Sequence, residues 1–225
     1  MSALRILLTG FEPFGGRQTN TSERIIQSLG EIKLDGAEFQ TIILPVSARR
    51  MPEVFLERLN AFDPQVVLSL GEQGKQWMSV ERLAINLLEF DFGCRDNDKL
   101  FLRDHPVRPD GPTAYWSTIP VRAICEAISA TGTECELSLS ADSFICNQAM
   151  YLALDWASHR PLMAQAGFLH LPALPDENHR STIELDRQVK AVWTALRVIV
   201  EEHDLQLNTE LPTKARNVAN HIGRM

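Results

Sequence analysis

Residues 134–174 give the clearest evidence for the fold class, and their sequence is ECELSLSADSFICNQAMYLALDWASHRPLMAQAGFLHLPAL. Its two ends, 134–140 and 166–174, are short apolar runs typical of buried strands, and the segment between them, 143–160, is apolar over a helical length. A helix that joins two such strands by a right-handed crossover makes them parallel. The stretch therefore predicts an α/β fold, a mainly parallel twisted sheet with helices on both faces.

The rest of the chain repeats this alternation of short apolar runs and longer amphipathic segments. Further strands are expected at 4–10, 39–46 and 65–71, with a more ambiguous run at 80–87. Further helices are expected at 20–30, 50–62, 120–132 and 182–203.

Two segments break the alternation. Residues 89–112 are dense in charge, Gly, Asn and Pro and predict a long irregular connection. Residues from about 205 to 225 have little apolar periodicity and predict a loosely packed C-terminal tail. Since 225 residues compare with roughly 150 per domain, we expect one α/β domain over residues 1–225.

Composition excludes several classes of protein. With 44% hydrophobic and 23% charged residues, the chain is expected to fold, and its net charge of -7 opposes binding to nucleic acids or anionic membranes. No window holds the roughly 18 consecutive apolar residues of a membrane span, and the N-terminus lacks the features of a signal peptide, so we expect a cytoplasmic protein. Four sparse cysteines without a CxxC pair are expected as free thiols: Cys94, Cys125, Cys135 and Cys146.

Familiar cofactor and metal motifs are missing from the sequence. The loop TGFEPFGG (9–16) lacks GxGxxG spacing, and GEQGKQ (71–76) lacks the pattern of a P-loop. HExxH, a GxSxG elbow and a His/Cys cluster at zinc spacing do not occur. We therefore expect no cofactor and no metal.

One arrangement of reactive side chains follows from the predicted topology. Cys146 falls in the first turn of the helix at 143–160, where free backbone N–H groups and the helix dipole favour a thiolate. His170 lies near the carboxyl end of the next strand, and parallel strands bring both residues to one edge of the sheet. Such a pair serves as nucleophile and base, and Glu81 is the candidate that orients the imidazole.

Each of these residues also has an ordinary structural explanation. A cysteine in an apolar helix is more often inert packing than a nucleophile. His170, within FLHLP, could be a satisfied core histidine, and Glu81 beside Arg82 could be an exposed ion pair worth roughly 0–1 kcal/mol.

The loop after the first strand gives a second clue. It places Phe11 and Phe14 on a Gly- and Pro-punctuated turn at the same edge, where aromatic side chains can line a small apolar pocket. The alternative is a local satellite core under the loop. Asn20 can likewise bind a ligand amide or cap the helix that follows.

Taken together, five blocks of the sequence resemble the pyroglutamyl peptidase I family. They occur in the family's order over about three-quarters of the chain: LLTGFEPFGG, VERLAIN, DGPTAYWSTIPV, SFICNQAMY and GFLHLPALP. The resemblance implies a cytoplasmic, metal-independent cysteine exopeptidase that removes an N-terminal pyroglutamyl (5-oxoproline) residue from peptides. It also implies assembly as a homodimer or homotetramer.

The resemblance also assigns roles to the candidate residues. Cys146 becomes the nucleophile, His170 the base that later protonates the leaving amine, and Glu81 the carboxylate that orients the imidazole. Phe11 and Phe14 match aromatic contacts to the flat lactam ring, and Asn20 falls near a position that assists its recognition. An apolar clamp with a few polar groups would separate the lactam from charged glutamate.

Four loops depart from the family pattern. Thr21 stands where the family has Pro, Asp142 precedes the helix of Cys146, Lys75 replaces a Gly, and the segment after AIN is about two residues longer. Because of this insertion, the family's arginine downstream of Glu81 has Arg95 as its nearest counterpart. These changes motivate an alternative hypothesis, a non-catalytic or substrate-shifted member that binds a small amide or a peptide N-terminus at the same site.

Overall fold

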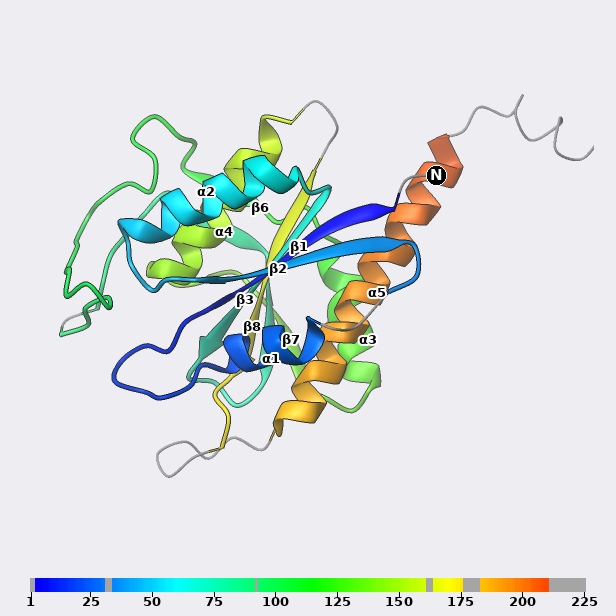
Figure 1. Ribbon diagram of the computed structural model, residues 1–225, viewed down its shortest axis with the longest axis horizontal. Helices are drawn as coiled ribbons and strands as arrows, with labels where there is room; N and C mark the ends of the chain where they lie inside the picture. The colour runs from blue at the N-terminus through cyan, green and yellow to red at the C-terminus, as the bar shows by residue number, and fades with distance from the viewer. Residues whose placement is uncertain (1–2, 31–33, 92, 161–163, 176–182, 211–225) are drawn as a thin grey trace, which may run out of the picture.

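A six-stranded sheet forms the centre of the computed structural model, which describes residues 3–30, 34–91, 93–160, 164–175 and 183–210 (Figure 1). The strand order is β2-β1-β3-β8-β4-β7. Neighbours pair in parallel except β4 and β8, which are antiparallel. The strands are β1 (Leu4–Phe11), β2 (Ala37–Leu44), β3 (Val66–Gln73), β4 (Met78–Glu81), β7 (Cys135–Ser138) and β8 (Gln165–Pro172).

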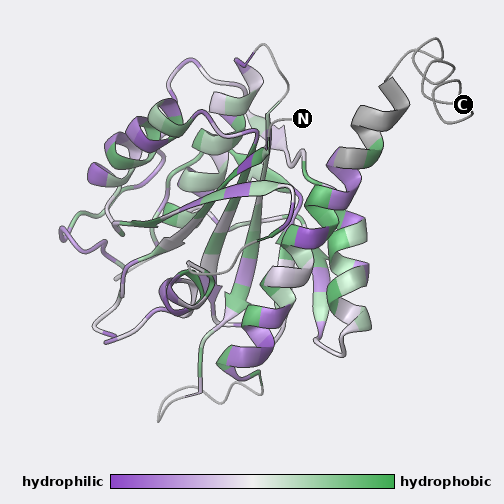
Figure 2. Cartoon of the chain, turned by 45° about the vertical axis from the view of Figure 1, so that its right-hand side comes forward, coloured by the Kyte–Doolittle hydropathy of each residue, from purple (hydrophilic) through white to green (hydrophobic). Residues whose placement is uncertain are grey.

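Helices cover both faces of this sheet (Figure 1). One apolar core lies under α2 (Arg50–Phe62) and α4 (Ile145–Ser158). The other lies under α1 (Thr21–Leu29), α3 (Val121–Ala130) and α5 (Leu185–Glu210). Hydrophobic residues concentrate on the strands and on the sides of the helices that face them (Figure 2). The predicted fold class, a mainly parallel sheet with helices on both faces, is thus confirmed.

One step of the topological prediction is wrong. Because β7 is parallel to β4 and β4 is antiparallel to β8, β7 runs antiparallel to β8, and the two strands are not neighbours. The parallel crossover assumed for residues 134–174 therefore does not exist. Cys146 and His170 nevertheless reach the same edge, because α4 packs on β8 and begins where β8 ends.

The remaining differences concern element boundaries. The ambiguous run 80–87 divides at Arg82 into β4 and a separate short strand, β5 (Leu83–Ile85). This strand pairs with β6 (Ala114–Trp116), which is too short for its sequence to signal a strand. Helix α5 continues to Glu210, since 205–210 contains no residue that interrupts a helix, so the expected tail is helical over these six positions. Residues 211–225 lie outside the described residues.

The segment 89–112 is irregular, as expected, and it is fixed by polar contacts. Its described residues add only an isolated bridge between Leu88 and His105. Arg108 forms a 2.6 Å ion pair with the buried Asp155 of α4. The Tyr151 hydroxyl, also on α4, donates a 2.7 Å hydrogen bond to the carbonyl of Pro112. The helix that carries Cys146 therefore also anchors this long connection.

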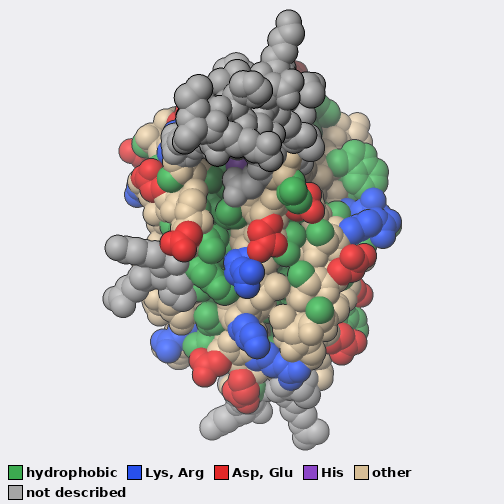
Figure 3. All heavy atoms as spheres, turned by 90° about the vertical axis from the view of Figure 1, so that its right-hand side faces the viewer, with side chains coloured by type: hydrophobic (Ala, Val, Ile, Leu, Met, Phe, Trp, Pro, Cys, Tyr) green, Lys and Arg blue, Asp and Glu red, His purple; other side chains and the backbone are tan. Residues whose placement is uncertain are grey.

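The face formed by α3 and α5 shows acidic and basic side chains mixed with hydrophobic ones (Figure 3). Within the described part of the chain, no helix is both long enough and apolar enough to cross a membrane.

Candidate active site

Cys146 lies beside the carboxyl ends of two central strands, β3 and β8. It is the second residue of α4, whose N-cap residue, Phe144, offers no capping side chain to the first turn. Gly71 of β3 pairs in register with His170 of β8. A Cβ atom added to Gly71 would lie 2.8 Å from the Cys146 Sγ. Cys146, Gly71 and His170 thus occupy one row across the carboxyl ends of β3 and β8.

His170 forms a hydrogen bond with Glu81, and both side chains are buried. The Nδ1 of His170 lies 2.8 Å from the Oε1 of Glu81, and the residues are 4% and 1% exposed. Glu81 comes from β4, the strand next to β8 on the side away from β3. Because Nδ1 is engaged by Glu81, Nε2 is the ring nitrogen available to Cys146. The exposed ion pair with Arg82 is not formed, since the Arg82 guanidinium lies 5.4 Å from the centre of the Trp116 ring.

The charge of His170 is determined by its two neighbours. Desolvation by burial lowers the pKa of His170, but hydrogen bonds with Cys146 and Glu81, together with their charges, outweigh it and raise the pKa to about 10. The imidazole is therefore held as a cation at neutral pH, between two groups that can each carry negative charge. A thiol, an imidazole and a carboxylate in this order can perform nucleophilic acyl transfer.

A pocket of about 130 Å³ opens beside Cys146. Three phenylalanines, Phe11, Phe14 and Phe144, form its aromatic wall. The rings of Phe14 and Phe144 lie 5.2 Å apart between centres, and Phe90, behind the wall, packs edge-on against Phe144 at 4.6 Å. The lining residues are Phe11, Phe14, Arg17, Thr19, Asn20, Val46, Glu72, Phe144, Ile145 and Cys146. Phe11 and Phe14 therefore line a pocket and also pack on the core beneath it.

Asn20 caps the first helix. Its Oδ1 accepts hydrogen bonds from the Ser22 backbone N–H at 2.9 Å and from the Ser22 hydroxyl at 2.7 Å. Its Nδ2 donates to the carbonyl of Glu12 at 3.2 Å. Of its two expected roles, the structure places Asn20 in the capping role, at the pocket wall.

Several residues of the pocket were not anticipated from the sequence. Phe144 is the pocket residue that the sequence could most easily have indicated. It directly precedes the helix of Cys146 and so lies at the same edge of the sheet. Glu72 pairs with Arg17 and accepts hydrogen bonds from the Thr21 N–H at 2.8 Å and hydroxyl at 2.7 Å. These polar contacts join the end of β3 to the loop between β1 and α1.

The residues that depart from the family pattern do not line the pocket themselves. Asp142 is exposed, with a φ of 58°, and Lys75 forms a 2.7 Å ion pair with Glu136. Arg95 turns back on its own loop and donates to the carbonyl of Lys99 at 3.0 Å. Across the described residues, His, Cys, Asp and Glu side chains form no group of three that could hold a metal ion. All four cysteines are free thiols.

Comparisons with known proteins agree with this arrangement. A family model described as pyroglutamyl peptidase matches residues 4–202. The chain is 36% identical to pyrrolidone-carboxylate peptidase 1 of Caldanaerobacter subterraneus subsp. tengcongensis, over 88% of this chain and 98% of that protein. It is 32% identical to the pyrrolidone-carboxylate peptidase of Pyrococcus furiosus, over 88% of this chain and 99% of that protein.

Solved structures show the same likeness. The pyrrolidone carboxyl peptidase of Thermococcus litoralis matches with a TM-score of 0.85 and 29% identity, over 90% of this chain and 96% of that one. The enzyme of Pyrococcus furiosus matches with a TM-score of 0.84 and 31% identity, over 88% and 99% of the two chains. In sequence and in fold, the chain belongs to the pyroglutamyl peptidase family.

Proposed function

We propose that the protein is a cysteine exopeptidase that hydrolyses the amide bond after an N-terminal pyroglutamyl residue of peptides. One observation carries the proposal: Cys146 stands between the His170–Glu81 pair and an aromatic pocket. The nucleophile and the recognition site for a small ring are thus adjacent. Membership of the pyroglutamyl peptidase family supports the same substrate.

The reaction begins with attack of the Cys146 thiolate on the carbonyl carbon of the amide bond that follows the pyroglutamyl ring. Backbone N–H groups at the start of α4, which lacks a capping side chain, are the proposed donors to the oxyanion. The His170 imidazolium gives its proton to the leaving amine, and the C–N bond breaks to leave a thioester on Cys146. Neutral His170 then takes a proton from water, whose oxygen attacks the thioester and releases pyroglutamate.

Glu81 supports both steps without becoming protonated. Its carboxylate holds Nδ1–H of the imidazole at 2.8 Å, so that Nε2 faces the reacting atoms and the cationic form of His170 is stabilised. The proposed roles are therefore nucleophile for Cys146, general base and acid for His170, and orienting carboxylate for Glu81.

The pocket accounts for the choice of a lactam over an open glutamyl residue. Phe11, Phe14 and Phe144 offer apolar surfaces to a flat, uncharged ring. An open glutamyl residue would bring an ammonium and a carboxylate into this aromatic site and lose their hydration. Asn20, at the pocket wall, is the proposed polar contact to the ring.

The proposal extends to the state of the protein in the cell. We propose one folded domain for the whole chain, a cytoplasmic location and a homodimer or homotetramer. Light scattering coupled to size-exclusion chromatography measures the oligomeric state directly.

Hydrolysis of a fluorogenic pyroglutamyl amide tests the function. The parent protein and its Cys146→Ala variant are compared under reducing conditions with a chelator, and the ring-opened glutamyl amide serves as the substrate control. Turnover of the lactam by the parent alone is expected. Absence of turnover by a folded parent contradicts the peptidase, and preference for the open form points to the substrate-shifted alternative.

A further inference from the structure

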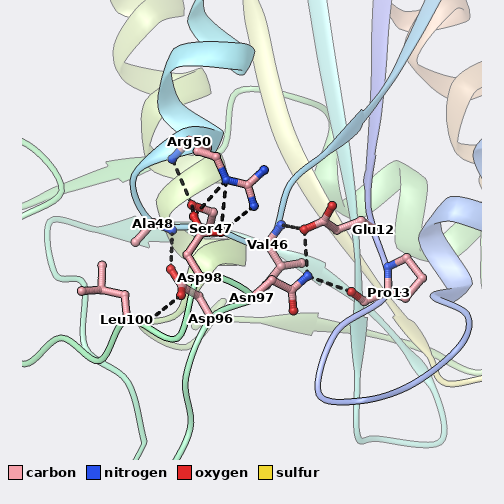
Figure 4. A network of polar contacts seen from close by, with 10 residues as sticks. All are labelled: Glu12, Pro13, Val46, Ser47, Ala48, Arg50, Asp96, Asn97, Asp98 and Leu100. Carbon is pink, nitrogen blue, oxygen red and sulfur yellow. Dashed lines mark hydrogen bonds and ion pairs between the residues drawn. The ribbon is translucent and has the colours of Figure 1, made fainter.

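A short segment of the long connection, Asp96–Leu100, fastens two walls of the pocket to each other (Figure 4). We call this segment the clasp. Its central residue is Asn97, whose backbone N–H donates to the carbonyl of Val46 at 2.9 Å. The Asn97 Nδ2 donates to the Glu12 Oε1 at 2.7 Å and to the carbonyl of Pro13 at 3.0 Å. The same Glu12 oxygen accepts the backbone N–H of Val46 at 3.0 Å.

These contacts join loops that no β-ladder connects at this point. Glu12 and Pro13 stand between the pocket residues Phe11 and Phe14, in the loop that follows β1. Val46 lines the pocket from the loop that follows β2. Irregular backbone has many alternative conformations, and fixing it costs entropy that specific contacts must offset. The Asn97 side chain thus holds Glu12 and Pro13 with both Nδ2 hydrogens, and the Asn97 backbone N–H holds Val46, so that one residue links the aromatic wall to the Val46 wall.

The clasp has a separate anchorage that does not involve Asn97. Buried Asp96 accepts the backbone N–H groups of Ala48 at 2.9 Å and Leu100 at 2.8 Å. Asp98 accepts the hydroxyl of Ser47 at 2.6 Å and pairs with Arg50 at 2.8 Å. Loss of the Asn97 amide would therefore leave the clasp in place and remove only its hydrogen bonds to Glu12 and Pro13 (Figure 4).

We propose that Asn97 is a positioning residue for lactam recognition: it sets the spacing of the pocket walls through Glu12 and Pro13, without touching the substrate. This inference rests on the proposed function for its substrate. It predicts that loss of the bridge weakens binding of the ring and leaves the chemistry at Cys146 intact, because none of the catalytic side chains contacts the clasp.

Two variants of Asn97 and a matched control test the inference. Asn97→Asp keeps the shape of the side chain but places a carboxylate against the Glu12 carboxylate and the Pro13 carbonyl. Asn97→Ala removes the same two hydrogen bonds without adding charge. Asn86→Ala, the control, removes the hydrogen bonds of another asparagine at the far end of the same connection, to the carbonyls of Arg108 and Gly111.

The KM for a pyroglutamyl amide should rise about tenfold in the Asn97 variants, as the loss of two hydrogen bonds would give, with kcat within twofold of the parent. The control should keep both values. Alkylation of Cys146 by iodoacetamide needs no pocket, so its rate should be unchanged, whereas protection by 2-pyrrolidinone should weaken about tenfold in parallel with KM. Burial raises the pKa values of Cys94 and Cys135, which therefore compete weakly for the reagent.

Melting temperatures separate positioning from loss of the fold. An unchanged KM in a folded Asn97→Ala protein overturns the inference. So does a parallel fall of kcat, alkylation rate and melting temperature, or an equal rise of KM in Asn86→Ala. If the parent itself shows no turnover, the proposed function fails, and protection of Cys146 by 2-pyrrolidinone still tests whether Asn97 shapes the pocket.

Discussion

The proposed catalytic residues and the pocket proposed for recognition are built in different ways. Glu81, Cys146 and His170 come from β4, α4 and β8, and the ladder between β4 and β8 fixes the spacing of Glu81 and His170. The pocket walls come largely from loops, which are joined by side-chain contacts such as those of Asn97 and Glu72. The chemistry therefore depends on the register of the sheet, and the specificity depends on a few polar side chains between loops.

The largest effect is expected from Glu81→Gln. The buried amide cannot stabilise the His170 imidazolium as a carboxylate does, so kcat should fall on the order of 100-fold or more with little change in KM. Because Glu81 raises the pKa of His170, its loss should lower that pKa from about 10. The imidazolium then loses its proton at lower pH, and the alkaline limb of the pH–rate profile should move in that direction.

Steady-state kinetics and an NMR titration of His170 check both parts of this prediction. A Glu81→Gln protein whose KM rises while its kcat is unchanged would contradict the proposed distinction between catalytic residues and pocket.

A smaller effect on the same side of the comparison is expected from Gly71→Ala. The new Cβ would lie 2.8 Å from the Cys146 Sγ and 2.7 Å from the Cζ of Phe168, so one of them must move. We expect a loss of about 1–3 kcal/mol in the free energy of unfolding and a fall of roughly 10-fold in kcat. Denaturant unfolding measures the first effect, and steady-state kinetics on the pyroglutamyl amide measure the second. Unchanged kcat would show that Cys146 tolerates a shifted position.

The smallest effect is expected from Glu72→Gln, on the pocket side. The amide oxygen can still accept the hydrogen bonds of Thr21, but the ion pair with Arg17 is lost. Because that ion pair holds the loop before α1 against the end of β3, and the hydrogen bonds of Thr21 remain, KM should rise about threefold or less, with kcat unchanged. Kinetics on the lactam amide measure this directly. A fall in kcat larger than the rise in KM would place Glu72 among the residues that govern the chemistry.

The sequence was most informative where regular elements carry the site. Cys146 in the first turn of a helix and His170 near a strand end were predictable from local patterns, and Glu81 was a candidate from its place after the third strand, to which the resemblance gave the same role. The direction of β7 was not predictable in this way, because the short connection between β3 and β4 reverses the direction of the chain, so that β4 and then β7 run opposite to β8. The meeting of Cys146 and His170 survived this error because it depends only on α4 and β8.

Loop contacts were beyond the reach of local patterns. Asn97 lies 85 residues from Glu12 in the chain, and nothing in its neighbourhood indicates that partner. Glu72 is 51 residues from Thr21, and the two meet only after β1, β3 and α1 have packed. Phe11 and Phe14 were recognisable because they stand at the end of the first strand and in the loop after it. Phe144 directly precedes the helix of Cys146 and could have been placed at the same edge of the sheet by the same reasoning.

The place of β8 has a consequence for how the molecule folds. This strand inserts between β3 and β4, which follow one another in the chain and could otherwise pair as a simple hairpin. His170 and Glu81 are 89 residues apart in sequence, so their contact closes a long loop, and such non-local pairings form slowly. Any pairing of β3 with β4 in a nascent chain must therefore open before β8 can enter between them, and His170 can meet Glu81 only after that strand has been synthesised.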